Sequence, residues 1–462
     1  MNSRLWNEGD GRRGSVKKYH SVVSEIEKRM KEGQYRPGEK LPSVRSAAAF
    51  YGCSVSTILR AYGELERTHA IYSIPQSGYY MVEKTEEPGP AGGSGTIDFA
   101  SASPDLNVFP YLDFQHCLNK AIDQYKYNLF TYGDAQGLDS LRRTLVSHLA
   151  EYQVFAKAER IIITSGIQQA LEILARMPFP GGRMEILVEQ PGYDIYLRYL
   201  EAEGLPVSGI GRSAAGINLR ELEERFASGK YKLFYTMPRY HNPLGTSYST
   251  AERQAIARLA GKYDVYIVED DYMADLGAGR QFDPVYAYDQ TSHVIYLKSF
   301  SKIIFPGLRL GAVVLPEPLL ETFRAYKGYT DTSLLSQAAL EVYIKNGMYE
   351  HHRHKIKAMY AKRIQAVYEA LREHNTEGLI EASADSSGIY MQFKLPVTVN
   401  LERLVKRLGE RKISVVPGNG FYLPYYRDRD KFIRISISRA GLDQIDEGIK
   451  AIVQEVKRGS GW

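Results

Sequence analysis

The stretch that decides the fold is VIYLKSFSK, residues 294–302. Its first four residues are β-branched, aromatic or aliphatic, which favours a buried strand. A serine-rich run that ends in a lysine follows where that strand ends. Three other short apolar runs, at residues 161–164, 233–236 and 266–268, alternate with helical patterns along the chain. This alternation is typical of an α/β domain in which helices cover a mostly parallel sheet.

The chain is longer than one hydrophobic core usually serves. Its 462 residues predict two or three domains, because a domain runs to roughly 100–200 residues. With 44% hydrophobic and 24% charged residues, the composition is that of an ordinary globular protein. No stretch approaches the roughly 18 apolar residues of a membrane span, and the N-terminus lacks the apolar run of a signal peptide. Cys53 and Cys117 are too few for a disulfide framework, so a cytoplasmic location without a membrane partner is expected.

The excess positive charge is confined to the first sixth of the chain. Residues 1–82 carry 13 Lys and Arg against 8 Asp and Glu, a net charge of +5 that equals the net charge of the whole chain. A basic unit joined to a neutral one predicts that the first meets a polyanion while the second binds something small. Residues 83–97 combine Pro, Gly and charge, which predicts a flexible linker between a first domain at 1–82 and a second at 98–462.

The basic unit has the pattern of three short helices followed by a hairpin. Apolar residues at helical spacing predict a helix over residues 17–31. Ser43 is placed to cap a second helix that runs to about Phe50, and Ser54 to cap a third. Two extended runs within residues 71–82 predict a β-hairpin wing.

The third predicted helix has an apolar face and a small, polar face. The side chains predicted to be buried are Val55, Ile58, Leu59, Tyr62 and Leu65. Those predicted to be exposed are Ser56, Thr57, Arg60 and Ala61. A small polar surface of this kind is able to enter a major groove. The alternative for three amphipathic helices is a bundle that binds no ligand.

The same segment carries an ordered set of motif residues. They are Tyr35, Pro37, Gly38, Lys40, Leu41, Pro42, Ser43, Arg45, Ser54, Ala61, Tyr62, Leu65, Glu66 and Gly78. In this order and spacing, residues 17–82 closely resemble the winged helix-turn-helix of GntR-type repressors. The resemblance implies that operator DNA is a partner, with the wing along the minor groove. The DNA-binding residues that it implies are Arg45, Ser54, Ser56, Thr57 and Arg60.

Five short motifs follow one another in the second domain. In chain order they are Ser165-Gly166-Ile167, Gln190-Pro191-Gly192-Tyr193, His241-Asn242-Pro243-Leu244-Gly245, Glu269-Asp270-Asp271-Tyr272, and Ser299-Phe300-Ser301-Lys302 with Arg309 seven residues on. The first motif follows a strand and opens a helix, and free amides at a helix N-terminus favour a phosphate. Pyridoxal phosphate needs a lysine for an imine, a carboxylate for its ring nitrogen, donors to its phenolate oxygen, an aromatic platform and a phosphate cup. The motifs offer each of these.

Each part of that cofactor has a candidate partner. Lys302 is the candidate catalytic residue, and the hydroxyls of Ser299 and Ser301 are placed to hold the phosphate. Asp270 ends a strand at the carboxyl edge of the sheet, where open α/β folds bind ligands. The other candidates are Gly166 and Ile167 at the helix N-terminus, Asn242 and Tyr272 as donors to the phenolate oxygen, Tyr193 as the stacking ring, and Arg309 as a bidentate phosphate contact. Taken singly, a strand-end Asp is usually a cap and a Lys is usually solvated.

The ordered set resembles fold-type I aminotransferases over residues 98–455. The resemblance implies a large domain with a mostly parallel sheet and a smaller α+β C-terminal domain at about residues 340–462. It implies that Arg434 anchors the carboxylate of a substrate or effector. It also implies a domain-swapped homodimer, in which Tyr132 of one subunit reaches the phosphate of the other. The sequence suggests no metal site.

A winged reader, a linker and an aminotransferase-like domain in one chain resemble MocR-type transcriptional regulators over the whole length. The resemblance implies a regulator that senses an amino acid or related amino compound by forming an external aldimine with it. The alternative is an active aminotransferase that carries a DNA-binding unit, because the catalytic residues are all present. Its weight rises because His241-Asn242 stands where many relatives have a His-Gln pair. Asp194-Ile195 lacks the arginine of GABA-responsive relatives, and Arg239 is the candidate for a distal carboxylate in its place.

Overall fold

The computed structural model describes residues 11–35, 38–67, 70–74, 77–81, 95–277, 283–328, 332–383 and 388–460. Pro37 and residues 82–94, which include most of the expected linker, lie outside them. The chain divides into two compact units, Met1–Ala91 and Gly92–Trp462. Each unit has a hydrophobic core of its own.

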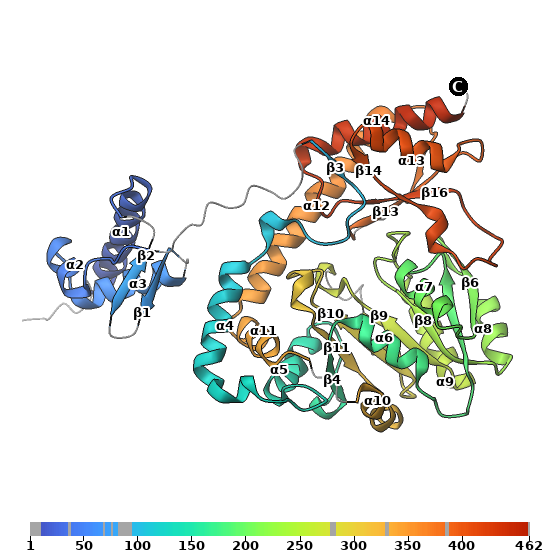
Figure 1. Cartoon of the computed structure of the whole chain (residues 1–462), viewed down its shortest axis with the longest axis horizontal. Coiled ribbons are helices and arrows are strands. Elements are labelled where there is room, and N and C mark those ends of the chain that lie inside the picture. The colour runs from blue at the N-terminus through green and yellow to red at the C-terminus, as the bar shows by residue number, and fades with distance from the viewer. Residues whose placement is uncertain are drawn as a thin grey trace, which may run out of the picture. The chain divides into compact units, whose positions relative to one another are not determined.

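The first unit consists of three helices and a two-stranded hairpin (Figure 1). Its elements are α1 (Gly11–Lys31), α2 (Val44–Phe50), α3 (Val55–Arg67), β1 (Ile71–Ile74) and β2 (Gly78–Met81). The Ser43 side chain caps α2 as predicted, accepting a hydrogen bond of 3.2 Å from the Ser46 N–H. The two strands pair antiparallel, with Ile71 opposite Met81. This order of elements confirms the predicted winged helix-turn-helix.

The buried face of α3 differs from the predicted one. Its buried side chains are Thr57, Ile58, Ala61, Tyr62 and Leu65. The prediction that Thr57 and Ala61 face outward is therefore wrong, and so is the burial of Val55 and Leu59, which are 46% and 48% exposed. Thr57 turns inward because the cap residue Ser54 holds it: the two hydroxyl oxygens lie 2.8 Å apart, and the Thr57 N–H donates to the same oxygen. Beyond Thr57, the buried stripe follows the i, i+3, i+4, i+7 spacing of an amphipathic helix.

The second unit is built on an eight-stranded sheet. In spatial order its strands are β4 (Ile161–Thr164), β11 (Gly311–Val314), β10 (Val294–Ser299), β9 (Tyr266–Asp270), β8 (Tyr231–Thr236), β5 (Glu185–Gln190), β6 (Val207–Ser213) and β7 (Gly216–Ile217). The five strands from β10 to β6 are parallel, while β11 runs antiparallel to both of its neighbours and β7 to β6. The prediction of a mostly parallel sheet is confirmed.

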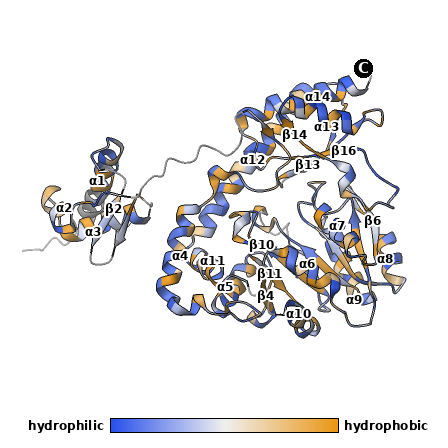
Figure 2. Cartoon of the chain, in the orientation of Figure 1, coloured by the Kyte–Doolittle hydropathy of each residue, from blue (hydrophilic) through white to orange (hydrophobic). Residues whose placement is uncertain are grey.

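Helices cover both faces of this sheet (Figure 2), and the central strands β8, β9 and β10 are buried along their whole length. The helices are α6 (Ile167–Arg176), α7 (Asp194–Ala202), α8 (Leu219–Ala227), α9 (Thr250–Tyr263) and α10 (Leu320–Lys327). Neighbouring residues of one strand pack into different cores: Val188 joins the core that holds α6 and α7, whereas Leu187 joins the core that holds α8 and α9. This is the two-sided burial that parallel strands require.

Three further helices pack together beside β4, namely α4 (Tyr111–Tyr125), α5 (Asp139–Ala150) and α11 (Leu334–Lys345). The long helix α12 (Met348–His374) follows α11 and reaches a smaller layer, where it packs on α14 (Leu442–Ser460) (Figure 1). No helix in the described ranges has both the length and the apolar character needed to cross a membrane.

The smaller layer is an antiparallel sheet with helices. Its strands, in spatial order, are β12 (Glu381–Ala382), β13 (Tyr390–Lys394), β16 (Phe432–Ser436) and β15 (Val416–Pro417), and α13 (Leu401–Glu410) packs beside α14. A separate parallel pair joins β3 (Ile97–Asp98) to β14 (Ile413–Ser414). The beginning of the second unit is therefore fixed to its C-terminal part, which brings residues 97–102 close to β16.

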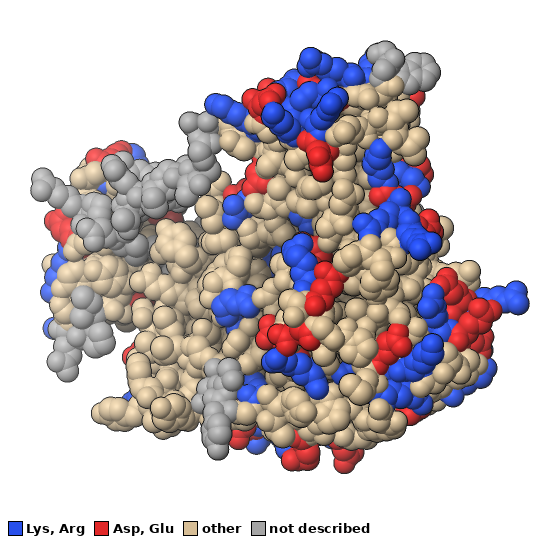
Figure 3. Space-filling view, turned by 45° about the vertical axis from the view of Figure 1, so that its right-hand side comes forward, with Lys and Arg blue, Asp and Glu red and all other residues tan. Residues whose placement is uncertain are grey.

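The visible surface of the second unit carries basic and acidic side chains side by side (Figure 3). This distribution agrees with the sequence, in which residues 83–462 hold 46 basic and 46 acidic residues once the first 82 are subtracted from 59 and 54. The part of the chain after residue 82 therefore has no excess charge of either sign to offer a polyanion.

Candidate functional site

A pocket of about 260 Å³ lies where the carboxyl ends of the central strands meet the smaller layer. Its lining includes Gly166, Ile167, Tyr193, Asn242, Asp270, Tyr272, Ser299, Ser301, Lys302, Arg309 and Arg434. These are all of the cofactor and effector residues that the sequence suggested, apart from Tyr132 and Arg239. Other residues also line it: Ala102, Gln168, Asp194, Ile195, Met237, Pro306 and Tyr390.

The topology of the sheet explains why distant motifs meet here. Strands β8, β9 and β10 are parallel neighbours, with Thr236 opposite Glu269 and Asp270 opposite Leu297. Residues that follow these strands therefore come together at one edge, which is where open α/β sheets bind ligands. The sequence motifs were informative because each follows a strand or opens a helix at that edge.

Asp270 is a buried carboxyl group in which only one of the two oxygens has a hydrogen-bond partner among the described residues. It is 1% exposed, and its Oδ2 accepts a hydrogen bond of 2.8 Å from the Tyr235 hydroxyl. Its Oδ1 is buried and has no hydrogen-bond partner among the described residues. Burial raises the pKa of Asp270 to about 7. A carboxyl group in this state gains most from a cationic N–H that enters the pocket.

Tyr235 was not recognised in the sequence as a site residue. It lies near the end of β8, one strand away from Asp270. The order of strands in the sheet decides this pairing, and no local motif marks it.

Arg309 and the N-terminus of α6 form a cationic corner of the pocket. The Arg309 Nη2 donates to the Ser165 carbonyl at 3.1 Å and to Gln168 Oε1 at 3.2 Å. Gly166 has φ +79°, and a Cβ added there would lie 3.0 Å from the Arg309 guanidinium. Only glycine allows this approach without strain. The helix N-terminus and the guanidinium together favour an anion.

Lys302 lies in the turn after β10 and points its amine into the pocket region. Its Nζ donates to the Ala102 carbonyl at 2.8 Å, and no ion pair joins it to any residue in the described part of the chain. Next to it, the Ile303 carbonyl accepts a hydrogen bond of 2.7 Å from the buried His352 of α12. The amine is therefore held by a backbone carbonyl and forms no ion pair with a carboxylate among the described residues.

Arg434 connects the smaller layer to the pocket. It is 6% exposed and donates from Nη1 to Asn242 Oδ1 at 3.1 Å and from Nη2 to the Ala100 carbonyl at 2.7 Å. Its guanidinium lies 4.5 Å from the centroid of the Tyr390 ring. Because Asn242 accepts with its oxygen, the amide nitrogen remains the donor end of that side chain.

The loop that carries Asn242 is held by a buried network that the sequence did not reveal. Glu189, which ends β5 with Gln190, accepts hydrogen bonds from Arg212 Nη1 at 2.6 Å and from the Thr236 hydroxyl at 2.6 Å. His241 Nε2 lies 3.2 Å from the same carboxylate. Burial works to raise the pKa of Glu189, but Arg212 and His241 hold it below its usual value. Burial also lowers the pKa of His241 to about 4, so this histidine is neutral at physiological pH.

Two predicted donors are engaged differently from expectation. The Tyr272 hydroxyl donates to the Tyr240 carbonyl, so donation to a phenolate oxygen would require that bond to break. Arg239 is not available for a distal carboxylate, because it forms a buried ion pair with Asp271 in which Nε donates at 2.9 Å. Arg239 is therefore corrected from a candidate effector contact to a structural one.

Tyr132 does not line the pocket of its own chain. It is 97% exposed, and two aromatic neighbours, Tyr127 and Phe130, are 85% and 66% exposed. Three exposed rings on one short segment are unusual for a surface that faces only water. Its predicted contact with a second subunit remains a prediction.

The residues predicted to contact DNA lie in α2, in α3 and in the turn between these two helices. Arg45, Ser54, Ser56 and Arg60 are exposed, whereas Thr57 is buried. The Arg60 guanidinium lies 5.4 Å from the centroid of the Tyr19 ring, which orients it on the outer side of α3. The hydroxyls of Ser54 and Ser56 lie 2.8 Å apart at the start of the helix. Thr57 is therefore removed from the predicted contact surface, and the other four remain candidates.

Two family models match the chain. Aminotransferase class I and II matches residues 105–452, and the bacterial regulatory proteins of the gntR family match residues 18–81. The HTH-type transcriptional regulator YcxD of Bacillus subtilis is 46% identical, over 96% of this chain and 100% of its own length. Aromatic-amino-acid aminotransferase 1 of Thermococcus litoralis is 28% identical, over 79% of this chain and 88% of its own.

Solved structures resemble the second unit. The kynurenine aminotransferase of Pyrococcus horikoshii, in complex with PMP, KYN as substrates and KYA as products, aligns with a TM-score of 0.73 at 29% identity, covering 79% of this chain and 92% of that one. A multiple substrate aminotransferase from Thermococcus profundus aligns with a TM-score of 0.73 at 26% identity, covering 80% and 93%. The chain therefore belongs to the aminotransferase class I and II family and, through its GntR-type N-terminal domain, to the MocR-type transcriptional regulators.

Proposed function

We propose that the chain is a pyridoxal-phosphate-dependent transcriptional regulator that binds operator DNA through its first unit and an amino acid or related amino compound through its second. The observation that carries this proposal is one chain that joins a GntR-type reader to a pocket where Lys302, Asp270, Arg309 and Arg434 converge. A cytoplasmic location, a homodimer, and a linker at residues 83–97 belong to the same proposal.

The pocket residues fit pyridoxal phosphate at its charged ends. The unpartnered Asp270 Oδ1 is suited to a protonated ring nitrogen, which would stabilise the charged form of this buried carboxyl group. Arg309 and the amides that open α6 suit the phosphate. Tyr193, whose hydroxyl accepts from Gln168 at 3.3 Å, lies in the same pocket as an aromatic platform. The cofactor of the solved kynurenine aminotransferase complex supports the same assignment.

The bound cofactor supplies an aldehyde carbon that condenses reversibly with primary amines and releases water. In the absence of effector, Lys302 is the amine of the chain placed to occupy that carbon. An effector amine would compete with Lys302 for that carbon: the bond to the effector nitrogen would replace the bond to Lys302, and the two protons that the effector amine gives up would pass to the lysine nitrogen. Arg434 binds the effector carboxylate in place of its hydrogen bond to Asn242. Sensing then consists of a change in what Lys302 and Arg434 contact.

The test uses the purified full-length protein loaded with pyridoxal phosphate and a panel of single amino acids. A cognate compound is expected to change the visible spectrum and the affinity for DNA fragments that the protein itself selects from a random pool. By linkage, those fragments must change the affinity for the compound by the same factor. Lys302→Ala is expected to abolish the spectral response, and Lys394→Ala, at a surface ion pair with Asp430, is the charge-matched control that leaves it intact.

The DNA-reading part of the proposal has its own test. Arg60→Ala should weaken binding to the selected DNA and leave the visible spectrum unchanged, because Arg60 lies on the exposed side of α3. Lys28→Ala removes the same charge from an exposed position of α1 and is the control. Equal loss in both variants would show that only net charge matters, which would remove Arg60 from the reading surface.

The second candidate function is an active aminotransferase. It is favoured by the 28% identity to an aromatic-amino-acid aminotransferase and by the presence of Lys302, Asp270 and Asn242 in one pocket. Transamination additionally requires the freed Lys302 to move a proton at the α-carbon of the bound amine. Release of keto acid over many turnovers, together with a DNA affinity that no tested amine changes, would support the aminotransferase function. A spectral and DNA response with little keto acid decides for the regulator.

A further inference from the structure

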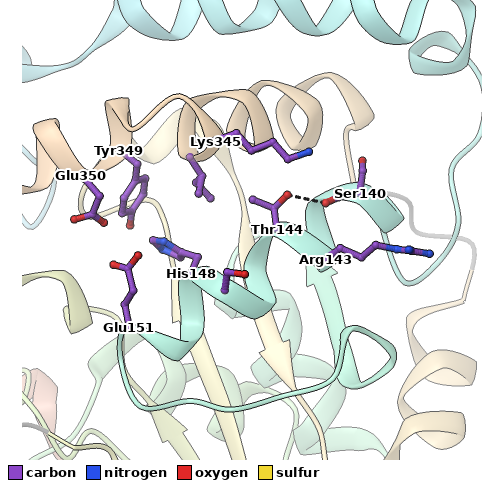
Figure 4. Close-up of a pocket in the computed structure, with 10 residues that line it drawn as sticks. Ser140, Arg143, Thr144, His148, Glu151, Lys345, Tyr349 and Glu350 are labelled. Atoms are coloured by element: carbon purple, nitrogen blue, oxygen red, sulfur yellow. Dashed lines mark hydrogen bonds between the residues drawn. The ribbon is translucent and has the colours of Figure 1, made fainter.

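A second pocket, of about 500 Å³, lies between α5, the end of α11 and the first turn of α12 (Figure 4). It shares no lining residue with the pocket that holds Lys302. At one end of it, His148, Glu151 and Glu350 point toward one another (Figure 4). One ligand atom from each of the three side chains lies within 4.8 Å of the others.

The two helices bring these three groups together in a simple way. His148 is in the last turn of α5 and Glu151 is its C-cap residue, three positions on, so both side chains lie on the same side of the helix. Glu350 is in the first turn of α12. An ion held by the three would therefore join the end of one helix to the start of another.

Two of the ligand residues have buried polar atoms without a partner. His148 is 3% exposed, and its Nε2 has no hydrogen-bond partner among the described residues. The same is true of Glu350 Oε1, whereas Arg353 pairs with the Oε2 of that carboxylate. Arg353 thus orients the carboxylate and leaves one oxygen unused. A buried polar atom that is left unpaired is costly, so a ligand that satisfies these two atoms is favoured.

The imidazole of His148 is buried and held in place by its neighbours. Aromatic rings fix its orientation: the centroid of Tyr349 lies 4.8 Å away and that of Tyr152 lies 5.3 Å away. A histidine held in this way loses little freedom on binding an ion.

The charged side chains around the site carry a net negative charge, which favours a cation. Asp275 accepts hydrogen bonds from Lys298 at 2.6 Å and from the Tyr349 hydroxyl at 2.8 Å beneath the site. Of the charged groups that act on the site, Glu151, Glu350 and Asp275 are anionic, and Lys298 and Arg353 are cationic. The two other cations that line the pocket, Arg143 and Lys345, are paired with Asp139 and Glu341. The carboxylates therefore outnumber the remaining cations by one, which favours a cation.

We propose that His148, Glu151 and Glu350 bind one divalent transition-metal ion of the zinc class. One imidazole and two carboxylates are common zinc ligands, and three protein ligands leave a fourth position for water from the pocket. Ligand atoms around zinc lie on the order of 3–3.5 Å apart, so the three side chains, whose ligand atoms lie within 4.8 Å of one another, draw together when the ion binds. The proposed ion fixes the start of α12, the helix whose His352 holds the backbone next to Lys302.

The chain contains a second cluster that serves as a control. Glu373, His374 and Asp446 also bring three ligand atoms within 4.8 Å of one another. There, however, His374 Nε2 already lies 2.8 Å from Asp446 Oδ1, and both acidic residues are exposed. Because His374 already has a hydrogen-bond partner, this second cluster is expected to bind a metal ion more weakly. Each cluster contains one histidine and two carboxylates, so a difference in binding would be due to the unpaired buried atoms of the first.

The test is calorimetric titration of the tag-free, EDTA-dialysed full-length chain with zinc chloride and, separately, magnesium chloride. One zinc ion per chain is expected, with a raised unfolding temperature and no comparable binding of magnesium. Glu151→Gln and Glu350→Gln are each expected to weaken zinc binding by at least about tenfold. Glu151 is exposed, so its variant keeps the fold. Glu373→Gln, in the control cluster, is expected to bind zinc as the wild type does.

Three results would overturn the proposal. They are the absence of stoichiometric zinc binding by the wild-type chain, wild-type zinc affinity in both Glu151→Gln and Glu350→Gln, and loss of binding in Glu373→Gln instead. None of them bears on pyridoxal phosphate, because the readout is zinc affinity and not activity.

Discussion

At the scale of single residues, the pocket that holds Lys302 contains a buried polar atom without a hydrogen-bond partner and a position where only glycine fits. Asp270 is the first of these residues, with a buried oxygen that has no described partner and a pKa of about 7. Gly166 is another residue of interest, because its positive φ and its closeness to Arg309 leave no room for a side chain at this corner of the pocket. Both residues lead to predictions that can be checked without knowing the effector.

Asp270→Asn is expected to stabilise the cofactor-free protein at pH 8. A carboxyl group whose folded pKa is raised above its unfolded value stays protonated longer in the folded state, so its burial costs stability as pH rises from about 4 to 7. Each unit of difference is worth about 1.4 kcal/mol, so the gain is on the order of a few kcal/mol at pH 8 and fades toward pH 4. Denaturant unfolding at both pH values measures it.

The control for this prediction is Asp123→Asn, at an exposed position of α4, which should change stability little at either pH. With pyridoxal phosphate present the sign should reverse, since the variant loses the anion that faces the ring nitrogen. A variant whose stability relative to wild type is the same at pH 4 and pH 8 would contradict the argument.

Gly166→Ala is expected to weaken pyridoxal phosphate binding and to destabilise the second unit by about 1–3 kcal/mol. Its φ is +79° and the new Cβ would lie 3.0 Å from Arg309. Gly204→Ala is the matched control, because Gly204 has φ +61° with nothing within 4 Å of the added Cβ. Both variants carry the backbone strain, so a loss of cofactor affinity in the first alone isolates the effect on the Arg309 corner. Visible absorbance during cofactor titration measures it.

At the scale of elements, α3 shows how a short helix chooses its buried face. From residue type alone, the apolar Leu59 would be expected on the buried face of α3. The cap at Ser54 and the packing of α1 and α2 instead bury Ala61 and Thr57. The surface offered to DNA is therefore more apolar than expected, since Leu59 and Val55 lie on it beside Arg60.

This orientation predicts opposite outcomes for two substitutions in α3. Ala61→Leu should destabilise the first unit by about 1–3 kcal/mol, because the added atoms have no room at a position of 0% exposure. Leu59→Ala should change stability by no more than about 0.5 kcal/mol. Amide hydrogen exchange of α3 and the β1–β2 hairpin in the full-length chain reports the difference. Equal protection in the two variants would argue against the observed face.

At the scale of the whole molecule, the exposed aromatic segment around Tyr132 is the feature that a single chain leaves unexplained. The proposed homodimer gives it a role, in which Tyr132 of each subunit completes the phosphate corner of the other. The two units of the chain have separate cores, so assembly of the second unit can be measured independently of DNA binding.

Tyr132→Phe is therefore expected to weaken pyridoxal phosphate affinity several-fold while leaving the dimer intact, because only one hydroxyl is removed. Tyr127→Phe is the control, as this ring is also exposed and has no proposed contact with the phosphate. Cofactor titration and sedimentation velocity together check the result. If both variants keep wild-type affinity, Tyr132 is removed from the proposed site.

The sequence by itself determined the order of domains, the class of fold and most of the pocket. It could do so because the motif residues sit at strand ends and helix starts, and parallel strands bring such ends to one edge whatever lies between them. Local signals also placed the caps at Ser43 and Ser54, since a cap depends only on residues a few positions away.

Only the tertiary structure decided which distant groups complete each site. Tyr235 meets Asp270 because β8 and β9 are neighbours, and Arg212 meets Glu189 because β6 pairs with β5. The face of α3 and the meeting of His148 with Glu350 likewise depend on how helices pack. Periodicity specifies that one side of an element is buried, but the partner on that side is chosen by the packing of the whole unit, which no local pattern encodes.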